Sequence, residues 1–182
     1  MNILDKALEI ANFAHKGQKR KYFNIPYITH PLEVMKRICV WGIDDEEILS
    51  TAVLHDSIED TVGHKQTVIA RQIQDLGGSI YKWVSDLTVY NGIKKEDYIK
   101  TFADKSAEVL IVKLADRVCN LNDFWLENPD GYFGKYYQKS IPLFKIYEDR
   151  ADEVYSYFKN ENIVHKIDKD LFKLKKKYSN GF

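Results

Sequence analysis

Hydrophobic residues recur at helical spacing along most of this chain. In residues 3–16 they lie three and four positions apart, which predicts an amphipathic helix that ends near Gly17. A basic loop follows, and Pro31 then suits the first position of a second helix. The apolar face of that second helix consists of Val34, Met35, Ile38 and Trp41.

The pattern predicts further helices in the middle of the chain. Asp44 and Glu47 have the spacing of a capping box, and the helix they open should run to about Thr61. Residues 66–76 and 95–103 are also helical in pattern, whereas the pair Gly77-Gly78 indicates a turn. The run VLIVKL would suit a buried strand by itself, but the helical spacing that continues through residues 108–125 favours a helix.

The last third of the chain repeats this pattern. Pro129, Asp130 and Gly131 mark a turn, and residues 134–159 resume helical spacing with Pro142 as a kink or a new start. A final helix is predicted for residues 162–177. The fold class predicted is all-α, and 182 residues suit one domain, 1–182, with its own core.

Composition narrows the class of protein. The chain is 45% hydrophobic and 30% charged, and none of its apolar runs approaches the roughly 20 residues of a membrane span, so a cytoplasmic protein is expected. Lys plus Arg equals Asp plus Glu, which removes the global electrostatic argument for nucleic-acid binding. Cys39 and Cys119 lie far apart, outside any redox or zinc spacing, and are predicted to be reduced.

The segment LHDSIEDT concentrates chemically useful side chains. His55 and Glu59 are four residues apart, as are Asp56 and Asp60, so on a helix both pairs would face one cavity. A single His-Asp dipeptide is weak evidence, because a buried histidine is more often a satisfied core residue than a ligand. The two acidic residues that follow make a chance occurrence harder to accept.

A metal ion needs ligands from other segments as well, and two segments offer them. ITHP supplies His30 at a helix entry, and KLADRVCNL supplies Asp116 within an apolar stretch where an unpaired carboxylate would be costly. The alternative for Asp116 is a salt bridge with Lys113 or Arg117 on its own helix, and taken alone that alternative is the stronger one.

Three blocks of this sequence resemble the hydrolase domain of the RelA/SpoT family and its stand-alone relatives, the small alarmone hydrolases. The blocks are AHKGQKRKYFNIPYITHP, LHDSIEDT and IVKLADRVCNL, and their order and separation match over roughly residues 7–125. The resemblance implies a helical bundle of the HD type, the fold of metal-dependent phosphohydrolases. It implies that one Mn²⁺, or another divalent metal, is bound by His30, His55, Asp56 and Asp116, and that Glu59 and Asp60 are the catalytic pair.

The resemblance also implies substrate contacts. Arg20 would stack on a guanine base, Lys21 would help to hold the nucleotide and Asn120 would hydrogen-bond base or ribose, although Asn120 could equally be a polar surface residue. Beyond Asp123 the match fades, and GYFGKYYQKS offers Lys135 and Lys139 as phosphate contacts, with Tyr136 and Tyr137 as further candidates. Tyr22 and Phe23 stand where relatives usually carry smaller or polar residues.

The function expected is therefore hydrolysis of the 3′-pyrophosphate of guanosine tetra- or pentaphosphate (ppGpp or pppGpp) to GDP or GTP plus pyrophosphate. Two alternatives stay open. One is an HD-type enzyme for another nucleotide, including a phosphatase for the 2′-phosphate of NADPH. The other is a nonenzymatic nucleotide-binding or antitoxin module, which would not need the Glu59-Asp60 pair. Self-association of the chain also stays open.

Overall fold

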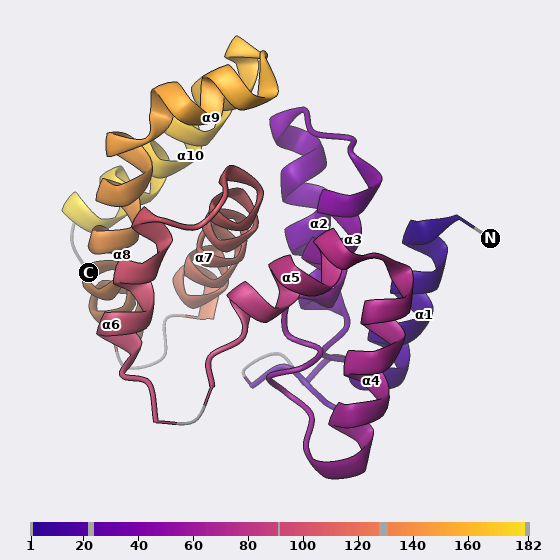
Figure 1. The fold of residues 1–182 in the computed structure, drawn as a ribbon. Helices are drawn as coiled ribbons and strands as arrows, with labels where there is room; N and C mark the ends of the chain where they lie inside the picture. The colour runs from indigo at the N-terminus through magenta and orange to yellow at the C-terminus, as the bar shows by residue number, and fades with distance from the viewer. Residues whose placement is uncertain (1, 22–23, 91, 128–130, 181–182) are drawn as a thin grey trace.

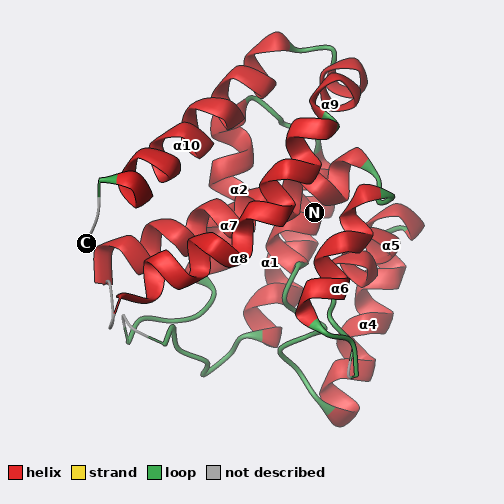
Figure 2. Ribbon diagram, turned by 90° about the vertical axis from the view of Figure 1, so that its left-hand side faces the viewer, coloured by secondary structure: helices red, strands yellow, loops and turns green. Residues whose placement is uncertain are grey.

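The computed structural model describes residues 2–21, 24–90, 92–127 and 131–180. Within these ranges the chain is built from helices and loops, with one isolated antiparallel bridge between Lys19 and Pro26 (Figure 2). The all-α fold predicted from the hydrophobic pattern is confirmed. No described helix is long and apolar enough to cross a membrane.

The helices follow one another along the chain with short connections. From the N-terminus they are α1 (Ile3–Ala14), α2 (Thr29–Trp41), α3 (Glu46–Leu54), α4 (Gly63–Leu76), α5 (Gly78–Leu87), α6 (Lys95–Lys100), the 3₁₀ turn η1 (Thr101–Ala103), α7 (Ala107–Glu127), α8 (Tyr132–Asp149), α9 (Ala151–Phe158) and α10 (Glu161–Ser179).

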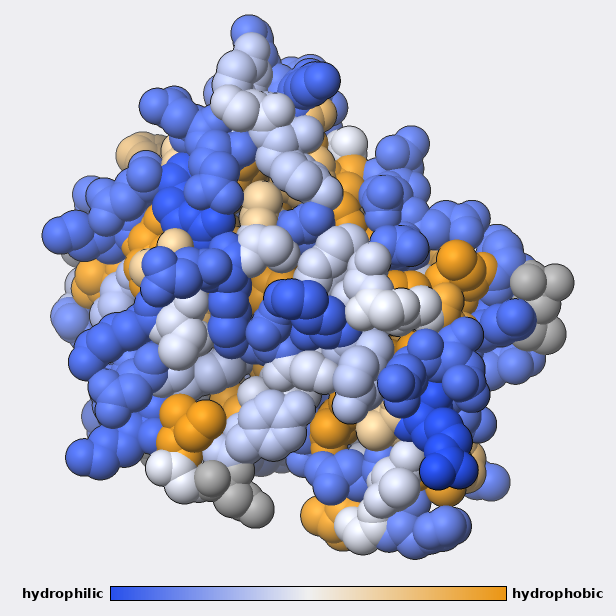
Figure 3. Space-filling view, in the orientation of Figure 1, coloured by the Kyte–Doolittle hydropathy of each residue, from blue (hydrophilic) through white to orange (hydrophobic). Residues whose placement is uncertain are grey.

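Two hydrophobic clusters hold the bundle together. The larger one joins α2, α3 and α7 to the C-terminal helices, and its largest fully buried side chains are Trp41, Tyr147, Phe102 and Phe133. The smaller one packs α1 and α3 against α4 and α5. Figure 1 shows the result, with α1 and α4 on one side, α8 to α10 on the other, and α2, α3 and α7 between them. The space-filling view shows a mostly hydrophilic face with small, scattered apolar patches (Figure 3).

The start of α3 differs by one residue from the prediction. Asp45, and not Asp44, is the N-cap, and its carboxylate accepts hydrogen bonds of 3.0 Å from the backbone N–H groups of Glu47 and Ile48. The capping box of Asp44 with Glu47 is therefore wrong. Two adjacent aspartates offer the same cap chemistry, and the sequence alone does not separate them.

The end of α3 also differs. The helix stops at Leu54, and residues 55–60 continue as successive turns rather than as helix to Thr61. The backbone N–H of Asp60 still donates to the carbonyl of Asp56 at 2.9 Å, so four-residue spacing survives in part of this segment. Asp56 and Asp60 therefore stay close together without a regular helix.

Helix α5 is absent from the prediction, because a glycine pair suggests a turn. Only Gly77 precedes the helix as its N-cap, while Gly78 is its first residue. The buried residues Ile80, Val84 and Leu87 have the helical spacing that would indicate it.

The C-terminal helices correct a further prediction. Helix α8 runs through Pro142 and ends only at Asp149. Arg150 then separates α8 from α9. Gly131 is the N-cap of α8 and has a left-handed conformation, while Pro129 and Asp130 of the expected turn lie outside the described residues. The VLIVKL run is helical as predicted, within α7. Cys39 and Cys119 are both free thiols, as expected.

Candidate active site

Four side chains from three segments converge at the centre of the bundle. His30 lies in the first turn of α2, His55 and Asp56 follow α3, and Asp116 lies midway along α7. His30 Nε2 lies 3.2 Å from Asp116 Oδ1 and 3.7 Å from Asp56 Oδ2. His55 Nε2 lies 3.1 Å from Asp56 Oδ2 and 3.9 Å from Asp116 Oδ1. The ligand atoms predicted from sequence thus face one point.

The orientation of His55 suits a metal ligand. Its Nδ1 lies 2.7 Å from the carbonyl oxygen of Ala52, which accepts the ring proton and leaves the Nε2 lone pair directed at the cluster. That Nε2 atom is buried and has no hydrogen-bond partner among the described residues. A buried ring nitrogen without a partner is costly, and a cation would satisfy it. The His30, His55 and Asp56 donor atoms all lie within 4.8 Å of one another.

Neighbouring side chains hold the two carboxylates in place. The Tyr27 hydroxyl donates to Asp56 Oδ2 at 2.6 Å. Lys113 Nζ lies 2.9 Å from Asp116 Oδ2, and the Asn120 amide donates to Asp116 Oδ1. The salt bridge considered as the alternative for Asp116 therefore exists with Lys113, and it leaves Oδ1 facing the cluster. Two imidazole nitrogens and two carboxylate oxygens form a donor set that fits a divalent metal ion.

The electrostatics keep both carboxylates ionised. Burial raises the pKa of Asp56, but the His55 and His30 rings outweigh it and hold that pKa well below its usual range. Burial likewise raises the pKa of Asp116, but the Lys113 ammonium and the two histidines outweigh it and lower that pKa as well. In His55, burial lowers the pKa while Asp56 and Asp116 raise it, to about 9. In the metal-free protein the two carboxylates thus keep a second proton on His55 at neutral pH, and a divalent ion would displace that proton and bind the freed Nε2 lone pair.

Glu59 and Asp60 lie at the solvent-exposed rim of this cluster. Glu59 Oε2 accepts a 2.9 Å hydrogen bond from the backbone N–H of Val89, which ties the carboxylate to the segment after α5. The carbonyl of Asp60 accepts from the Gln18 amide at 2.9 Å. Burial and the charge of Asp56 raise the pKa of the Asp60 carboxyl to about 6. A carboxyl with that pKa can take up and release a proton near neutral pH.

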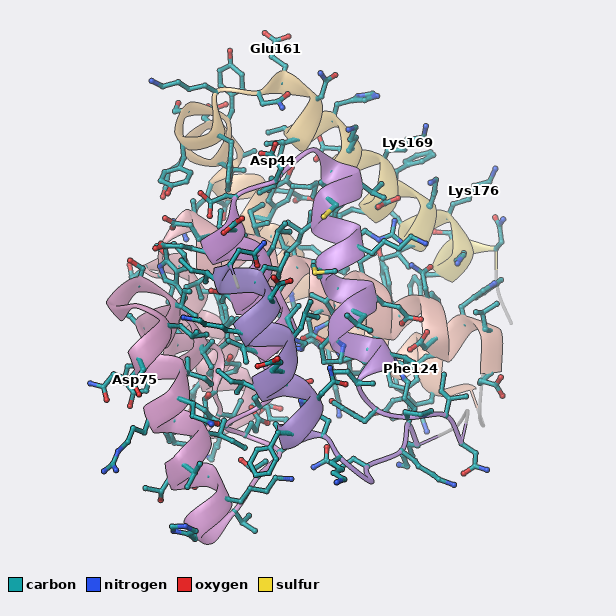
Figure 4. The ribbon with its side chains drawn as sticks, turned by 90° about the vertical axis from the view of Figure 1, so that its right-hand side faces the viewer. Asp44, Asp75, Phe124, Glu161, Lys169 and Lys176 are labelled. Atoms are coloured by element: carbon teal, nitrogen blue, oxygen red, sulfur yellow. The ribbon has the colours of Figure 1, made fainter. Side chains whose placement is uncertain are left out.

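A cavity of about 180 Å³ opens beside His30. It brings together three of the predicted substrate contacts, Arg20, Lys21 and Asn120, with aromatic side chains around them. Phe124, one of those aromatic residues, lies near the end of α7 beside the loop between α1 and α2 (Figure 4). The remaining lining residues are Tyr27, His30, Asp123 and Tyr132.

Arg20 is held firmly in this cavity. Its guanidinium lies 3.1 Å from Glu33 Oε2 and forms a second ion pair with Asp123, and its side chain is only 9% exposed. A planar guanidinium fixed by two carboxylates presents a flat face on which a base can stack. Tyr22 and Phe23, on the same loop, lie outside the described residues.

The predicted phosphate contacts of α8 occupy a different position. Lys135 and Lys139 are exposed, whereas Tyr136 is partly buried and Ser140 is buried. The side of α8 that carries Tyr136 and Ser140 packs on α7, at Arg117. The structure thus does not bring the two lysines into the metal cluster.

Sequence reasoning missed several residues of the site. Tyr27 belongs to no motif of its own, although it lies three residues before His30 and so within reach of the same face. A larger cavity of about 610 Å³ is lined by Glu59 and its neighbours, by α4, by Tyr81 of α5 and by the segment after α5. Ile58, Glu59 and Thr61 of its lining belong to LHDSIEDT, whereas the other lining residues carry no local motif and come together where α4 packs against α5.

Comparison with known proteins identifies the family of this chain. The family model of the HD domain matches residues 7–131. This chain belongs to the HD-domain family. The match spans all four converging side chains and the three blocks that carry the resemblance to RelA/SpoT-type hydrolases, and that resemblance is confirmed.

Individual relatives place the HD protein more narrowly. It is 35% identical over 130 residues to guanosine-3′,5′-bis(diphosphate) 3′-pyrophosphohydrolase MESH1 of Xenopus tropicalis, covering 69% of this chain and 73% of the relative. It is 31% identical over 129 residues to the MESH1 protein of Drosophila melanogaster, covering 70% of this chain and 72% of the relative. The HD protein is thus of the small, MESH1-like type.

A solved structure shares the fold over nearly the whole length. It is that of a metazoan ortholog of SpoT, which is described as hydrolysing ppGpp and acting in starvation responses. The TM-score is 0.75 at 24% sequence identity, and the match covers 95% of this chain and 96% of the other. The shared fold therefore extends beyond residue 131, into the C-terminal helices.

Proposed function

We propose that this chain hydrolyses the 3′-pyrophosphate of guanosine tetra- or pentaphosphate to GDP or GTP plus pyrophosphate. The observation that carries the proposal is the convergence of His30, His55, Asp56 and Asp116 on one buried point beside a narrow cavity that contains Arg20. The names of the two MESH1 relatives support the choice of substrate. We place the activity in the cytoplasm, as the composition predicts.

The four converging side chains would hold one divalent metal ion. A mixed set of nitrogen and oxygen donors suits Mn²⁺, which we propose as the native metal, although Fe²⁺ and Zn²⁺ accept similar ligands. When bound, such an ion lowers the pKa of a coordinated water and offsets negative charge on phosphate oxygens.

The chain's own carboxylates would manage the protons. In the reaction, a water oxygen bonds to the phosphorus attached to the ribose 3′ oxygen, and the bond from that phosphorus to the 3′ oxygen breaks. The electron pair stays on the 3′ oxygen, which must receive a proton. Asp60 and Glu59, at the rim of the cluster, would take the proton of the water and return one to the 3′ oxygen.

The nucleoside half would bind in the small cavity. The guanidinium of Arg20, fixed by Glu33 and Asp123, would stack on the guanine, and Lys21 would approach the 5′ phosphates. Asn120 lies between Asp116 and this cavity, where its amide can also reach the ribose. Lys135 and Lys139 stay as proposed phosphate contacts from the exposed side of α8.

The products of the reaction show which bond of the substrate is cleaved. Metal-free protein is incubated with ppGpp, Mn²⁺ is added, and pyrophosphate and orthophosphate are measured separately, with His55→Ala and Glu59→Ala as inactive controls. We expect Mn²⁺-dependent pyrophosphate with GDP as co-product. Turnover without metal, or undiminished turnover in both variants, would contradict the mechanism. NADPH is assayed in parallel. If it releases orthophosphate while ppGpp stays intact, the substrate of this site is the 2′-phosphate of NADPH.

A further inference from the structure

Arg117 is a buried cation that the proposed function has not used. It follows Asp116 on α7, and only 8% of the residue is exposed. Its guanidinium carbon lies 4.7 Å from the centroid of the Tyr136 ring, and Nη1 lies 3.5 Å from Ser140 Oγ. Its Nε atom is buried and has no hydrogen-bond partner among the described residues.

The ion pairs around the site make this arrangement unusual. Over the described part of the chain, no carboxylate oxygen lies within salt-bridge distance of the Arg117 guanidinium. Buried arginines are normally paired with a carboxylate, because an isolated charge is expensive to remove from water. The Tyr136 ring stabilises the face of the guanidinium but leaves its in-plane N–H donors largely unused. Nε is thus a buried donor without a partner among the described residues, which an anion would satisfy.

The neighbours of Arg117 indicate which anion it would bind. Lys113 precedes it by one helical turn and is paired with Asp116, so two cations flank one metal-facing carboxylate. Burial raises the pKa of the Tyr136 hydroxyl, and the charges of Arg117, Asp116 and Lys113 all act on it. These groups therefore lie close together, where α7 meets α8. The cavity that contains Arg20 is lined by other residues of α7, from Asn120 onwards.

We propose that the Arg117 guanidinium binds the pyrophosphoryl group of the substrate, with Tyr136 and Ser140 of α8 as the platform that holds it. The proposal rests on the proposed function, in which that group is transferred to water. Two parallel N–H donors match two phosphate oxygens, and a guanidinium stays charged at every relevant pH. The exposed lysines of α8 cannot supply such a fork.

The role predicts a selective effect. A guanidinium that holds the pyrophosphoryl group contributes to the binding of ppGpp and of the product pyrophosphate, but not to the binding of the product GDP. A residue that only packs α7 against α8 would instead affect both products together, along with thermal stability. The two products therefore separate an anion-binding role from a structural one.

The test compares Arg117→Gln and Arg117→Lys with Lys145→Gln, which removes one positive charge from an exposed position of α8. Each Mn²⁺-loaded variant is assayed for ppGpp hydrolysis and for inhibition by pyrophosphate and by GDP. For Arg117→Gln we expect kcat/KM to fall, and the inhibition constant of pyrophosphate to rise, by roughly ten- to a hundredfold, as for a lost hydrogen bond to a charged group. GDP inhibition should stay as in Lys145→Gln, and Arg117→Lys should recover part of the loss.

Other outcomes would overturn the proposal. Pyrophosphate inhibition that is unchanged in Arg117→Gln excludes anion binding, and equal weakening of pyrophosphate and GDP assigns Arg117 a structural role. If Arg117→Gln does not fold, the same comparison is made with Arg117→Lys, which keeps the charge and loses the fork. If the wild-type protein leaves ppGpp intact, the proposed function fails, but the role of Arg117 is still tested. Calorimetric titration of the wild-type protein and of Arg117→Gln with pyrophosphate then decides it.

Discussion

His30 Nε2 lies 3.2 Å from Asp116 Oδ1, although 86 residues separate the two in sequence. The contact joins the first turn of α2 to the middle of α7, and these two helices pack along each other at the centre of the fold. The cluster of His and Asp side chains is thus built into one of the main helix contacts of the core. Loss of ligand geometry and loss of core packing are therefore coupled at this point.

Removal of the Tyr27 hydroxyl tests how the Asp56 carboxylate is oriented. Tyr27→Phe keeps the ring, whose centroid lies 4.8 Å from that of His15 and 5.9 Å from that of His30, and removes the hydroxyl that donates to Asp56 and also hydrogen-bonds Asp60. We expect the affinity for Mn²⁺ to fall roughly tenfold, as for other residues that orient metal ligands. The free energy of unfolding of the metal-free protein should change by only about 1 kcal/mol. Unchanged metal affinity in a calorimetric titration would show that Asp56 does not depend on Tyr27.

Replacement of Lys113 should lower the free energy of unfolding more in the metal-free protein than in the Mn²⁺-loaded protein. In Lys113→Met the buried Asp116 carboxylate loses its ammonium partner, and breaking a buried pair costs about 3 kcal/mol or more. A divalent ion compensates the same carboxylate, so the loss measured by urea unfolding should shrink when Mn²⁺ is saturating. An equal loss in both conditions would show that Asp116 does not face the ion.

The two acidic residues at the rim should affect chemistry and leave metal binding intact. Glu59→Gln and Asp60→Asn each remove a group that can exchange a proton, and we expect kcat to fall roughly a hundred- to ten-thousandfold. Because neither side chain belongs to the four converging ligands, Mn²⁺ should still bind with about wild-type affinity. A loss of metal that parallels the loss of rate would make one of them a ligand instead.

Helix α10 is fixed to α2 through Asp170, far from the site. Its Oδ2 accepts hydrogen bonds from Trp41 Nε1 at 3.1 Å and from Arg37 Nη1 at 2.8 Å, while Lys169 and Lys176 extend from the outer side of the helix (Figure 4). We expect Asp170→Ala to lower the free energy of unfolding by about 2 kcal/mol, because the buried indole N–H loses its acceptor. The kcat of the folded fraction should not change, and a fall in kcat would connect α10 to catalysis.

The sequence predicted that four side chains converge better than it predicted the exact helix boundaries. His30, His55, Asp56 and Asp116 could be found because each lies in a short block whose residue types and spacing are distinctive. The helix after Gly77 and the cap at Asp45 could not, because glycine pairs and adjacent aspartates permit more than one local structure.

Side-chain contacts that arise from the packing of helices were harder still to predict from the sequence. From the sequence, Arg117 is a candidate salt-bridge partner of Asp116 on the same helix. Only the approach of α8 shows that its guanidinium stacks on Tyr136 and has no carboxylate partner among the residues described. Tyr27 lies on a loop whose path is set by the helices on either side, so its hydrogen bond to Asp56 left no signal in the sequence.

The most direct test of the account is a titration of metal-free protein with Mn²⁺, in which bound ion and pyrophosphate release from ppGpp are measured on the same samples. We predict that the rate rises in proportion to bound Mn²⁺ and reaches its plateau at one ion per chain, and that Asp116→Asn neither binds the ion tightly nor gains activity. Full hydrolysis before any ion is bound, or equal binding and rate in Asp116→Asn, would contradict the proposed metal centre.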